Sequence, residues 1–282
     1  MFSDYNVLIT GANGYIGSHV VQKLLEIGCN VIAIDLNNNY IDTRAKIINF
    51  DIFNDDVNKI LDIYKPNICL HLAWQDGFIH NSEKHLISLP SHYKFIKDLI
   101  NYGIEHIAIM GTMHEVGYWE GEIDDKTPTN PISLYGIAKN SLRQSIDILA
   151  KEKNIVFQWL RAFYIYGDDL RNKSVFTKIM SMEKEGKTEF PFTSGENKYD
   201  FISINELATQ IAKTLLQTEI TGIINCCTGN PVSLKDKVES YIQDNCFKIK
   251  PLYGAFQDRP YDSPEIWGNN EKIKIVLNNF TN

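Results

Sequence analysis

Gly11-Ala12-Asn13-Gly14-Tyr15-Ile16-Gly17 is the stretch of sequence that decides the fold. Its glycines have G-x-x-G-x-x-G spacing and stand between an apolar, β-branched run at 5–10 and a helix-length segment at 15–27. Glycine allows a tight turn, lets a pyrophosphate approach the N-terminus of the helix, and lets the helix pack closely on the strand. The stretch therefore predicts a strand, a phosphate-binding turn and a helix that open a dinucleotide-binding unit.

Working outward, β-rich runs alternate with amphipathic segments over the first 165 residues. We expect strands at 5–10, 30–34, 47–50, 67–72, 104–110 and 155–161, and helices at 15–27, 91–102 and 133–153. The strands are continuous in Val, Ile and Leu, which is typical of a parallel sheet covered by helices on both faces. The sequence predicts an α/β fold with a Rossmann-type, doubly wound parallel sheet in residues 1–165. Residues 166–282 are expected to form a smaller α/β substrate-binding region that is partly interleaved with the Rossmann domain.

Composition narrows the class of protein. The 282 residues are 44% hydrophobic and carry 28 Lys and Arg against 35 Asp and Glu, a net charge of -7. A large core is expected, and nucleic acid is not expected as a partner. No basic and apolar leader and no run of about 18 apolar residues is present, so we expect no membrane partner and a cytoplasmic location.

The cysteines and histidines do not indicate a metal site. The five cysteines, at 29, 69, 226, 227 and 246, are odd in number and lack C-x-x-C spacing, so we expect reduced, buried thiols. The seven histidines lie between His19 and His114 without ligand spacing supported by cysteines or carboxylates. No metal is predicted.

Asp35 ends the second expected strand, near the offset of about 20 residues at which an acidic side chain hydrogen-bonds an adenosine ribose. Its carboxylate would accept a hydrogen bond from the 2′-OH and repel a 2′-phosphate. The sequence therefore favours NAD(H), while NADP(H) is not excluded.

Tyr135 and Lys139 stand four residues apart and therefore share one face of the expected helix 133–153. A nearby ammonium favours phenolate, so we expect Lys139 to lower the pKa of Tyr135. A phenol tuned in this way can donate a proton to a nascent alkoxide.

Further segments carry a resemblance to a known family. His71-Leu72-Ala73-Trp74 is similar to an H-x-A-A strand end, Asp51-Ile52 to an adenine-contacting pair, and Gly111-Thr112 through Gly117 to the segment with a catalytic Ser or Thr. Arg259-Pro260-Tyr261-Asp262 is similar to a C-terminal R-P-x-D. Nearly the whole chain resembles the extended short-chain dehydrogenase/reductase family, the NAD-dependent epimerase/dehydratase superfamily, and in particular its members that modify nucleotide sugars.

The resemblance implies roles for individual residues. Cofactor contacts are implied for Gly11, Asn13, Gly14, Tyr15, Ile16, Gly17, Asp35, Asp51, Ile52, Leu72, Ala73, Trp74, Tyr135, Lys139 and Phe163. Substrate contacts are implied for Trp74, Thr112, His114, Tyr135, Tyr164 and Arg259, and catalytic roles for Thr112, Tyr135 and Lys139. A homodimer paired through the helices 91–102 and 133–153 is implied as well.

Departures from the family pattern narrow the expected reaction. Sugar 4,6-dehydratases of this family carry an Asp-Glu pair directly after the catalytic Thr, where this chain has Met113 and His114. Dehydration is therefore disfavoured, although Glu115 lies only one position later and a bulge would reposition it. Trp74 and Tyr164 replace smaller residues of the family, which would make the sugar pocket narrower.

These expectations combine into one hypothesis with two alternatives. The hypothesis is an NAD(H)-dependent reduction of the C4 keto group of a nucleotide-linked 4-keto-6-deoxy sugar, such as dTDP-4-dehydro-6-deoxyglucose, in polysaccharide precursor synthesis. The first alternative is a nucleotide-sugar 4-epimerase with tightly bound NAD. The second is a non-catalytic NAD-binding protein on the same fold. The pattern leaves the nucleotide base, the choice of hexose or heptose, and the configuration at C4 open.

Overall fold

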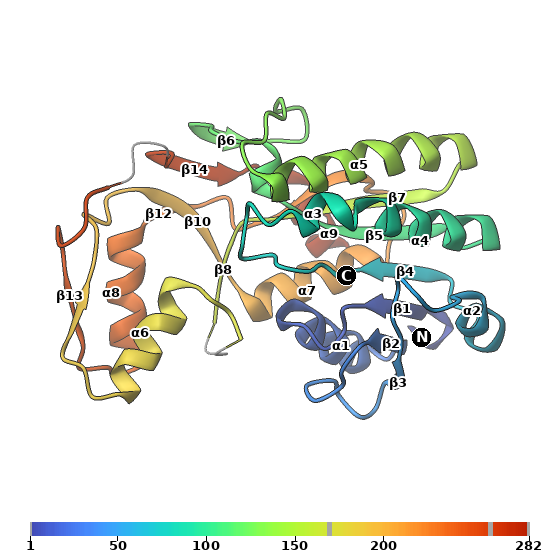
Figure 1. The fold of residues 1–282 in the computed structure, drawn as a ribbon, viewed down its shortest axis with the longest axis horizontal. Coiled ribbons are helices and arrows are strands. Elements are labelled where there is room, and N and C mark those ends of the chain that lie inside the picture. The colour runs from blue at the N-terminus through green and yellow to red at the C-terminus, as the bar shows by residue number, and fades with distance from the viewer. Residues whose placement is uncertain (1, 168–170, 259–261, 281–282) are drawn as a thin grey trace.

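A seven-stranded parallel sheet lies at the centre of the larger part of the molecule (Figure 1). The computed structural model describes residues 2–167, 171–258 and 262–280. The strand order is β11-β7-β5-β4-β1-β2-β3. The strands are β1 (Asn6–Thr10), β2 (Asn30–Asp35), β3 (Lys46–Asn49), β4 (Ile68–His71), β5 (His106–Thr112), β7 (Val156–Ala162) and β11 (Gly222–Cys226). This order confirms the doubly wound fold.

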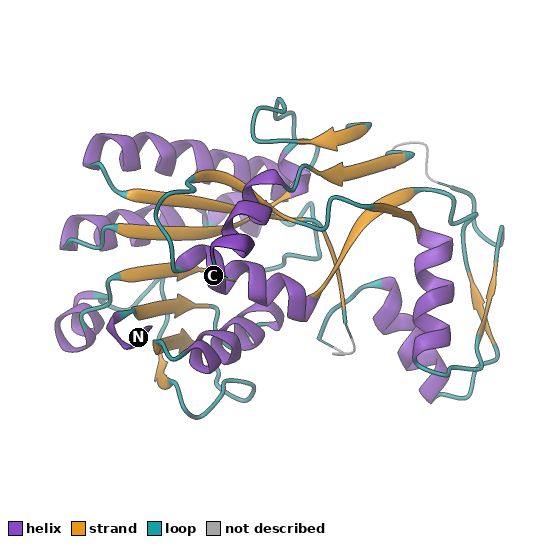
Figure 2. Cartoon of the chain, turned by 180° about the vertical axis from the view of Figure 1, so that it is seen from behind, coloured by secondary structure: helices purple, strands orange, loops and turns teal. Residues whose placement is uncertain are grey.

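Helices cover both faces of this sheet (Figures 1 and 2). One face packs against α1 (Tyr15–Ile27), α7 (Ile204–Leu215) and α9 (Glu271–Asn279). The other packs against α2 (Asn58–Tyr64), α4 (Leu89–Tyr102) and α5 (Leu134–Lys153), with the short α3 (Lys84–Ile87) leading into α4. Because both faces are covered, the central strands are apolar over most of their length, as expected.

The smaller part holds an aromatic-rich core of its own. Its main sheet has the order β12-β10-β14-β6, with β8 beside β10, and a second ribbon pairs β13 with β9. The elements are β6 (Gly121–Ile123), β8 (Tyr164–Tyr166), α6 (Val175–Lys184), β9 (Glu189–Pro191), β10 (Lys198–Ser203), β12 (Pro231–Ser233), α8 (Leu234–Asp244), β13 (Lys250–Leu252) and β14 (Glu265–Gly268). The chain passes between the two parts more than once, since β6 belongs to the smaller sheet, while α7, β11 and α9 complete the larger layer system.

Local signals explain the helix ends. Helix α1 covers the expected residues and stops at Gly28, whose φ of 100° suits glycine. Ser133 caps α5 by accepting a hydrogen bond from the Gly136 N–H at 3.2 Å, and Asn154 ends it in the left-handed region. Among the described helices, none has the length and apolar character needed to span a bilayer.

Two expectations need correction. The strand expected at 104–110 lies two residues later, because β5 keeps pairing with β7 until Thr112 faces Ala162. Four of the five free cysteines are buried as expected, but Cys246 is exposed. It occupies a turn after α8 with a φ of 53°, where its side chain has no core to enter.

The topology places the predicted chemistry at one edge of the sheet. The chain leaves β1 toward β2 on one side and later returns to β4 on the other, so β1 and β4 flank a topological switch point. The carboxyl ends of β1, β2, β4 and β5 all meet at this edge. A ligand-binding crevice is expected there.

Candidate active site

The glycine-rich turn lies at the carboxyl end of β1 and has no room for side chains. Gly11 has a φ of 68°, and a Cβ atom there would lie 2.6 Å from the Ala73 nitrogen. A Cβ atom at Gly17 would lie 2.1 Å from the Gly11 oxygen. Gly14 is the N-cap of α1 and supplies no side-chain cap, so the first N–H groups of the helix remain for an anion. This backbone fits a pyrophosphate.

A cavity of about 260 Å³ opens beside this turn. The residues expected to bind the cofactor that line it are Gly11, Gly14, Asp35, Asp51, Ile52, Leu72, Ala73 and Trp74. The sequence analysis missed other lining residues, which are Ile34, Leu36, Phe50, Phe53, Gln75 and His92. Apolar walls with a few polar groups suit a dinucleotide.

Asp35 ends β2 at the rim of this cavity. One carboxylate oxygen accepts the Asn13 N–H at 3.0 Å, and the other accepts the Leu36 N–H at 2.7 Å. The Asn13 side chain in turn accepts the Tyr40 N–H at 2.8 Å. These bonds hold the carboxylate beside the glycine-rich turn, where it could accept a hydrogen bond from a ribose hydroxyl.

Thr112 and Tyr135 come together from β5 and α5. Thr112 is buried at the end of β5, and its side chain lies close enough to the Tyr135 hydroxyl to favour the phenolate, although burial outweighs this effect on the pKa of Tyr135. Lys139, one turn further along α5, is 2% exposed, and its Nζ donates to the Met110 oxygen at 2.8 Å. The same Nζ lies 3.9 Å from the centre of the Trp74 ring. All three residues expected to be catalytic therefore gather next to the cofactor cavity.

The electrostatics of this group differ from the expectation. Burial, with the nearby charge of Glu115, raises the pKa of Tyr135 above its ordinary value, so the expected lowering by Lys139 is wrong for this structure. Burial also lowers the pKa of Lys139 to about 7. The cause is desolvation, which outweighs the favourable contacts of the ammonium with the Met110 carbonyl and the Trp74 ring.

Glu115 is enclosed in the core below Thr112. Its carboxylate accepts the Thr112 N–H at 2.7 Å and the Trp159 Nε1–H at 2.8 Å. The guanidinium groups of Arg143 and Arg161 lie 3.5 and 3.7 Å from it. Burial raises the pKa of Glu115 against the effect of these partners. The short turn at 113–115 therefore directs this carboxylate inward and not to a substrate.

Aromatic rings surround the Tyr135 side chain. The ring centres of His80, His85, His114 and Trp74 lie 5.6, 5.2, 6.1 and 6.2 Å from it. His114 is half-buried, as a pocket-lining residue would be, and burial lowers its pKa to about 4. These imidazole, indole and phenol rings make a wall suited to a sugar.

The remaining predicted residues lie farther from this centre. Tyr15 and Ile16 pack in the first turn of α1, and Phe163 is 6% exposed in the core of the smaller part. The Tyr164 ring lies 4.3 Å from the Tyr199 ring at the border of that core. Arg259 lies outside the described residues. The described part of the chain contains no group of three or more His, Cys, Asp or Glu side chains placed to hold a metal ion.

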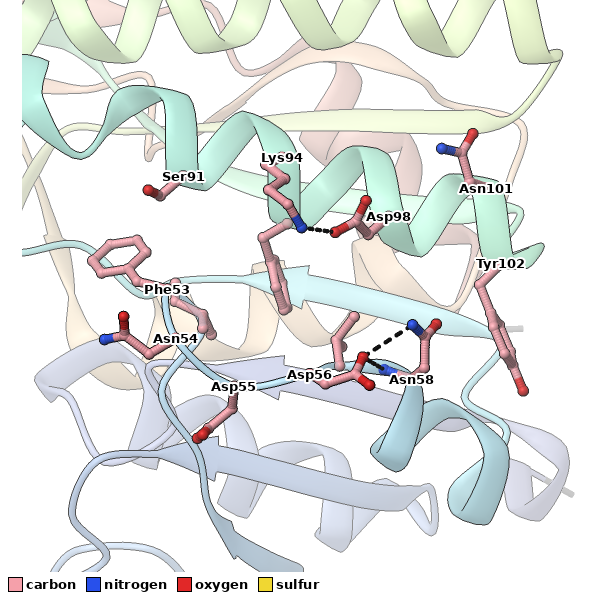
Figure 3. Close-up of a pocket in the computed structure, with 13 residues that line it drawn as sticks. Phe53, Asn54, Asp55, Asp56, Asn58, Ser91, Lys94, Asp98, Asn101 and Tyr102 are labelled. Carbon is pink, nitrogen blue, oxygen red and sulfur yellow. Dashed lines mark hydrogen bonds and ion pairs between the residues drawn. The ribbon is translucent and has the colours of Figure 1, made fainter.

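A larger cavity of about 730 Å³ lies on the far side of Phe53, between the segment 52–58 and α4 (Figure 3). Its polar groups bond to one another, because Lys94 pairs with Asp98, and Asp56 accepts from Asn58. None of the residues expected to be catalytic lines it. The candidate active site is therefore the smaller cavity with the Thr112, Tyr135 and Lys139 group.

Comparisons with known proteins show which sequences and structures this chain is similar to. Residues 7–227 match the model of the NAD dependent epimerase/dehydratase family. The chain is 45% identical over 269 residues to the dTDP-6-deoxy-L-talose 4-dehydrogenase (NAD(+)) of Aggregatibacter actinomycetemcomitans, covering 93% of this chain and 99% of that protein. Among solved structures it is similar to the UDP-glucose 4-epimerase of Thermotoga maritima, with a TM-score of 0.80, 23% identity, and coverage of 96% and 91%. It is also similar to the UDP-N-acetylglucosamine 4-epimerase of Methanobrevibacter ruminantium, with a TM-score of 0.83, 21% identity, and coverage of 96% and 91%.

Proposed function

The chain belongs to the NAD-dependent epimerase/dehydratase family, and from this premise we propose that it is an NAD(H)-dependent nucleotide-sugar 4-ketoreductase. Its proposed reaction interconverts a dTDP-linked 6-deoxy sugar and the corresponding 4-keto sugar. The relative that is 45% identical is named for dTDP-6-deoxy-L-talose, which makes this sugar the first candidate. The observation that carries the proposal is the group of Thr112, Tyr135 and Lys139 beside the glycine-rich cavity, whose wall includes Trp74 at 3.9 Å from the Lys139 Nζ.

Thr112 and Tyr135 have different roles in the proposed reaction. NADH, when bound, supplies the hydride that reduces C4. Thr112 orients and polarises the keto oxygen by a hydrogen bond, and Tyr135 gives its hydroxyl proton to that oxygen as the alkoxide forms. A high pKa keeps Tyr135 protonated until negative charge develops next to it.

Lys139 and Asp35 hold the dinucleotide in this proposal. The buried Lys139 ammonium would donate to hydroxyls of the nicotinamide ribose. The Asp35 carboxylate beside Asn13 would accept from the adenosine ribose and disfavour a 2′-phosphate, which supports NAD(H) over NADP(H).

The competing reactions of the family have less support in this site. Elimination needs a carboxylate at the sugar, but the Glu115 carboxylate is buried in the core, where it accepts hydrogen bonds from the Thr112 N–H and the Trp159 Nε1–H. Epimerisation requires the keto intermediate to turn over within the pocket. Trp74 opposes this, since its Nε1–H is bonded to His85 at 3.0 Å and its ring stacks on His92 at 4.4 Å.

The proposal is tested with purified protein and the Tyr135→Phe variant. With dTDP-6-deoxy-L-talose and NAD⁺ we expect stoichiometric NADH formation, and with the 4-keto sugar and NADH its reversal, in both cases faster than with NADP(H). The variant should bind NAD⁺ but lose most turnover. Absence of any cofactor turnover, together with C4 inversion of a nucleotide sugar and tightly held NAD, would establish the epimerase instead. Binding of NAD⁺ without turnover of any sugar would favour the non-catalytic alternative.

The assembly and the location of the protein belong to the same proposal. A homodimer paired through α4 and α5 and a cytoplasmic site of action are what the family resemblance and the sequence imply. Sedimentation equilibrium of the purified chain tests the first.

A further inference from the structure

Two buried histidines form a hydrogen-bonded chain at the floor of the cofactor cavity. Thr10 Oγ1 lies 2.8 Å from His71 Nδ1, and His71 Nε2 lies 2.9 Å from His92 Nδ1. Thr10, His71 and His92 are each 0% exposed. His92 lines the cavity beside Phe53 and Trp74. The chain thus runs from the core to the wall of the cofactor site.

The hydroxyl of Thr10 sets the direction of this chain. Its oxygen already accepts the Ala73 N–H at 3.1 Å and shares the Leu72 N–H, at 3.2 Å, with the Thr10 carbonyl oxygen, so two donors face its lone pairs. The hydroxyl hydrogen therefore goes to His71 Nδ1, which must be unprotonated to accept it. A neutral His71 then carries its proton on Nε2 and donates to His92 Nδ1.

Both imidazoles are neutral in this environment. Burial and the neighbouring charge of Lys139 hold the pKa of His71 well below its ordinary value and lower the pKa of His92 to about 3. A neutral imidazole carries one proton, and His92 Nδ1 is already the acceptor in the chain. The proton of His92 consequently lies on Nε2.

This Nε2–H group has no hydrogen-bond partner among the described residues, although it is buried. The ring cannot turn freely, because it stacks on Trp74 with ring centres 4.4 Å apart and makes a T-shaped contact with Phe53, with ring centres 5.0 Å apart. A buried donor without an acceptor is costly and rare in native proteins. The group is therefore fixed in place for an acceptor that arrives from the cavity.

We infer that His92 donates a hydrogen bond from Nε2 to an acceptor atom of the bound dinucleotide, and that Thr10 and His71 select the tautomer that makes this possible. The inference rests on the proposed use of a dinucleotide. It adds a cofactor-binding residue on α4, a helix that the sequence analysis left without one. Thr10 and His71 act as positioning residues, since they act through His92.

The first test measures the Kd for NAD⁺ by calorimetry on protein freed of dinucleotide. His92→Phe keeps a ring against Trp74 and Phe53 but removes the donor, and we expect roughly tenfold weaker binding. His92→Gln restores a donor and should recover part of this loss. His106→Phe is the matched control, because His106 is also buried but bonds Gln158 at the opposite end of β5, and its Kd should not change.

The second test reads the tautomer directly. Nitrogen-15 NMR of the imidazoles should show His92 protonated on Nε2 and not on Nδ1, with the Nε2–H resonance shifting when NAD⁺ is added. A proton on Nδ1 would overturn the inference. If the wild-type protein binds no NAD⁺, the proposed function fails; if it binds NAD⁺ and His92→Phe binds it equally tightly, only this inference fails.

Discussion

Replacing Lys139 by Met should stabilise the dinucleotide-free protein near neutral pH and should change how its stability depends on pH. Lys139 is 2% exposed, and burial lowers its pKa to about 7 from an ordinary value near 10.5. Between these two pH values the unfolded chain holds the proton and the folded chain does not. Stability therefore rises with pH through this window, and the full penalty of the buried charge is present below it.

The size of the effect follows from the difference between the two pKa values. Each pKa unit corresponds to about 1.4 kcal/mol, so the penalty below pH 7 is at most on the order of 5 kcal/mol. The Met110 carbonyl and the Trp74 ring both favour the ammonium and therefore make this penalty smaller. Over the two units from pH 7 to 9 the wild type should gain about 2–3 kcal/mol relative to Lys139→Met, which corresponds to roughly 5 °C in Tm.

Thermal melts followed by circular dichroism at several pH values from 6 to 9 give the measurement. Lys139→Met should melt above the wild type at pH 6, and the gap should close toward pH 9. Lys187→Met, at an exposed lysine, serves as the control and should track the wild type throughout. Parallel Tm curves for the wild type and Lys139→Met would refute the assignment of a penalised, buried charge to this site.

Three further substitutions test other parts of the argument. Tyr135→Phe should lower kcat by about 10²–10⁴ without changing Tm or the Kd for NAD⁺, and a loss of either would point to a structural role. Glu115→Ala should lower the free energy of unfolding in urea by about 3–5 kcal/mol, because it strands the buried charges of Arg143 and Arg161; a stable variant would contradict this. Gly17→Ala should abolish NAD⁺ binding, since the added Cβ would lie 2.1 Å from the Gly11 oxygen. Binding of NAD⁺ to this variant, measured by calorimetry, would contradict the close packing of the turn.

The fold follows from the sequence because its signals are local. The apolar runs and the glycine-rich turn define β1, α1 and β2 with nearly correct bounds, and Gly28 marks the end of α1 by its own backbone preference. The rule for parallel strands then predicts that Asp35 and Thr112 lie at the same edge of the sheet. The predicted bounds are wrong where pairing between distant segments determines the end of a strand, as at the end of β5.

The site was only partly predictable, because its electrostatics depend on contacts between distant segments. The spacing of Tyr135 and Lys139 suggests that the ammonium lowers the pKa of the phenol. In the fold, however, the Lys139 ammonium contacts the Met110 carbonyl and the Trp74 ring. In the sequence, His92 is only one of seven histidines without ligand spacing, so no local signal marked it. Only the structure shows that His71 reaches it.

The position of Glu115 connects the departure from the dehydratase pattern with the proposed reduction. A carboxylate that moves protons at a sugar must reach the sugar, whereas this one reaches the Thr112 N–H, the Trp159 ring N–H and two guanidinium groups. It holds the residue that would polarise the keto oxygen, and its charge helps to keep the Tyr135 hydroxyl protonated. In the proposed reaction, the side chain that cannot serve an elimination would therefore position Thr112 and keep Tyr135 protonated as the proton donor.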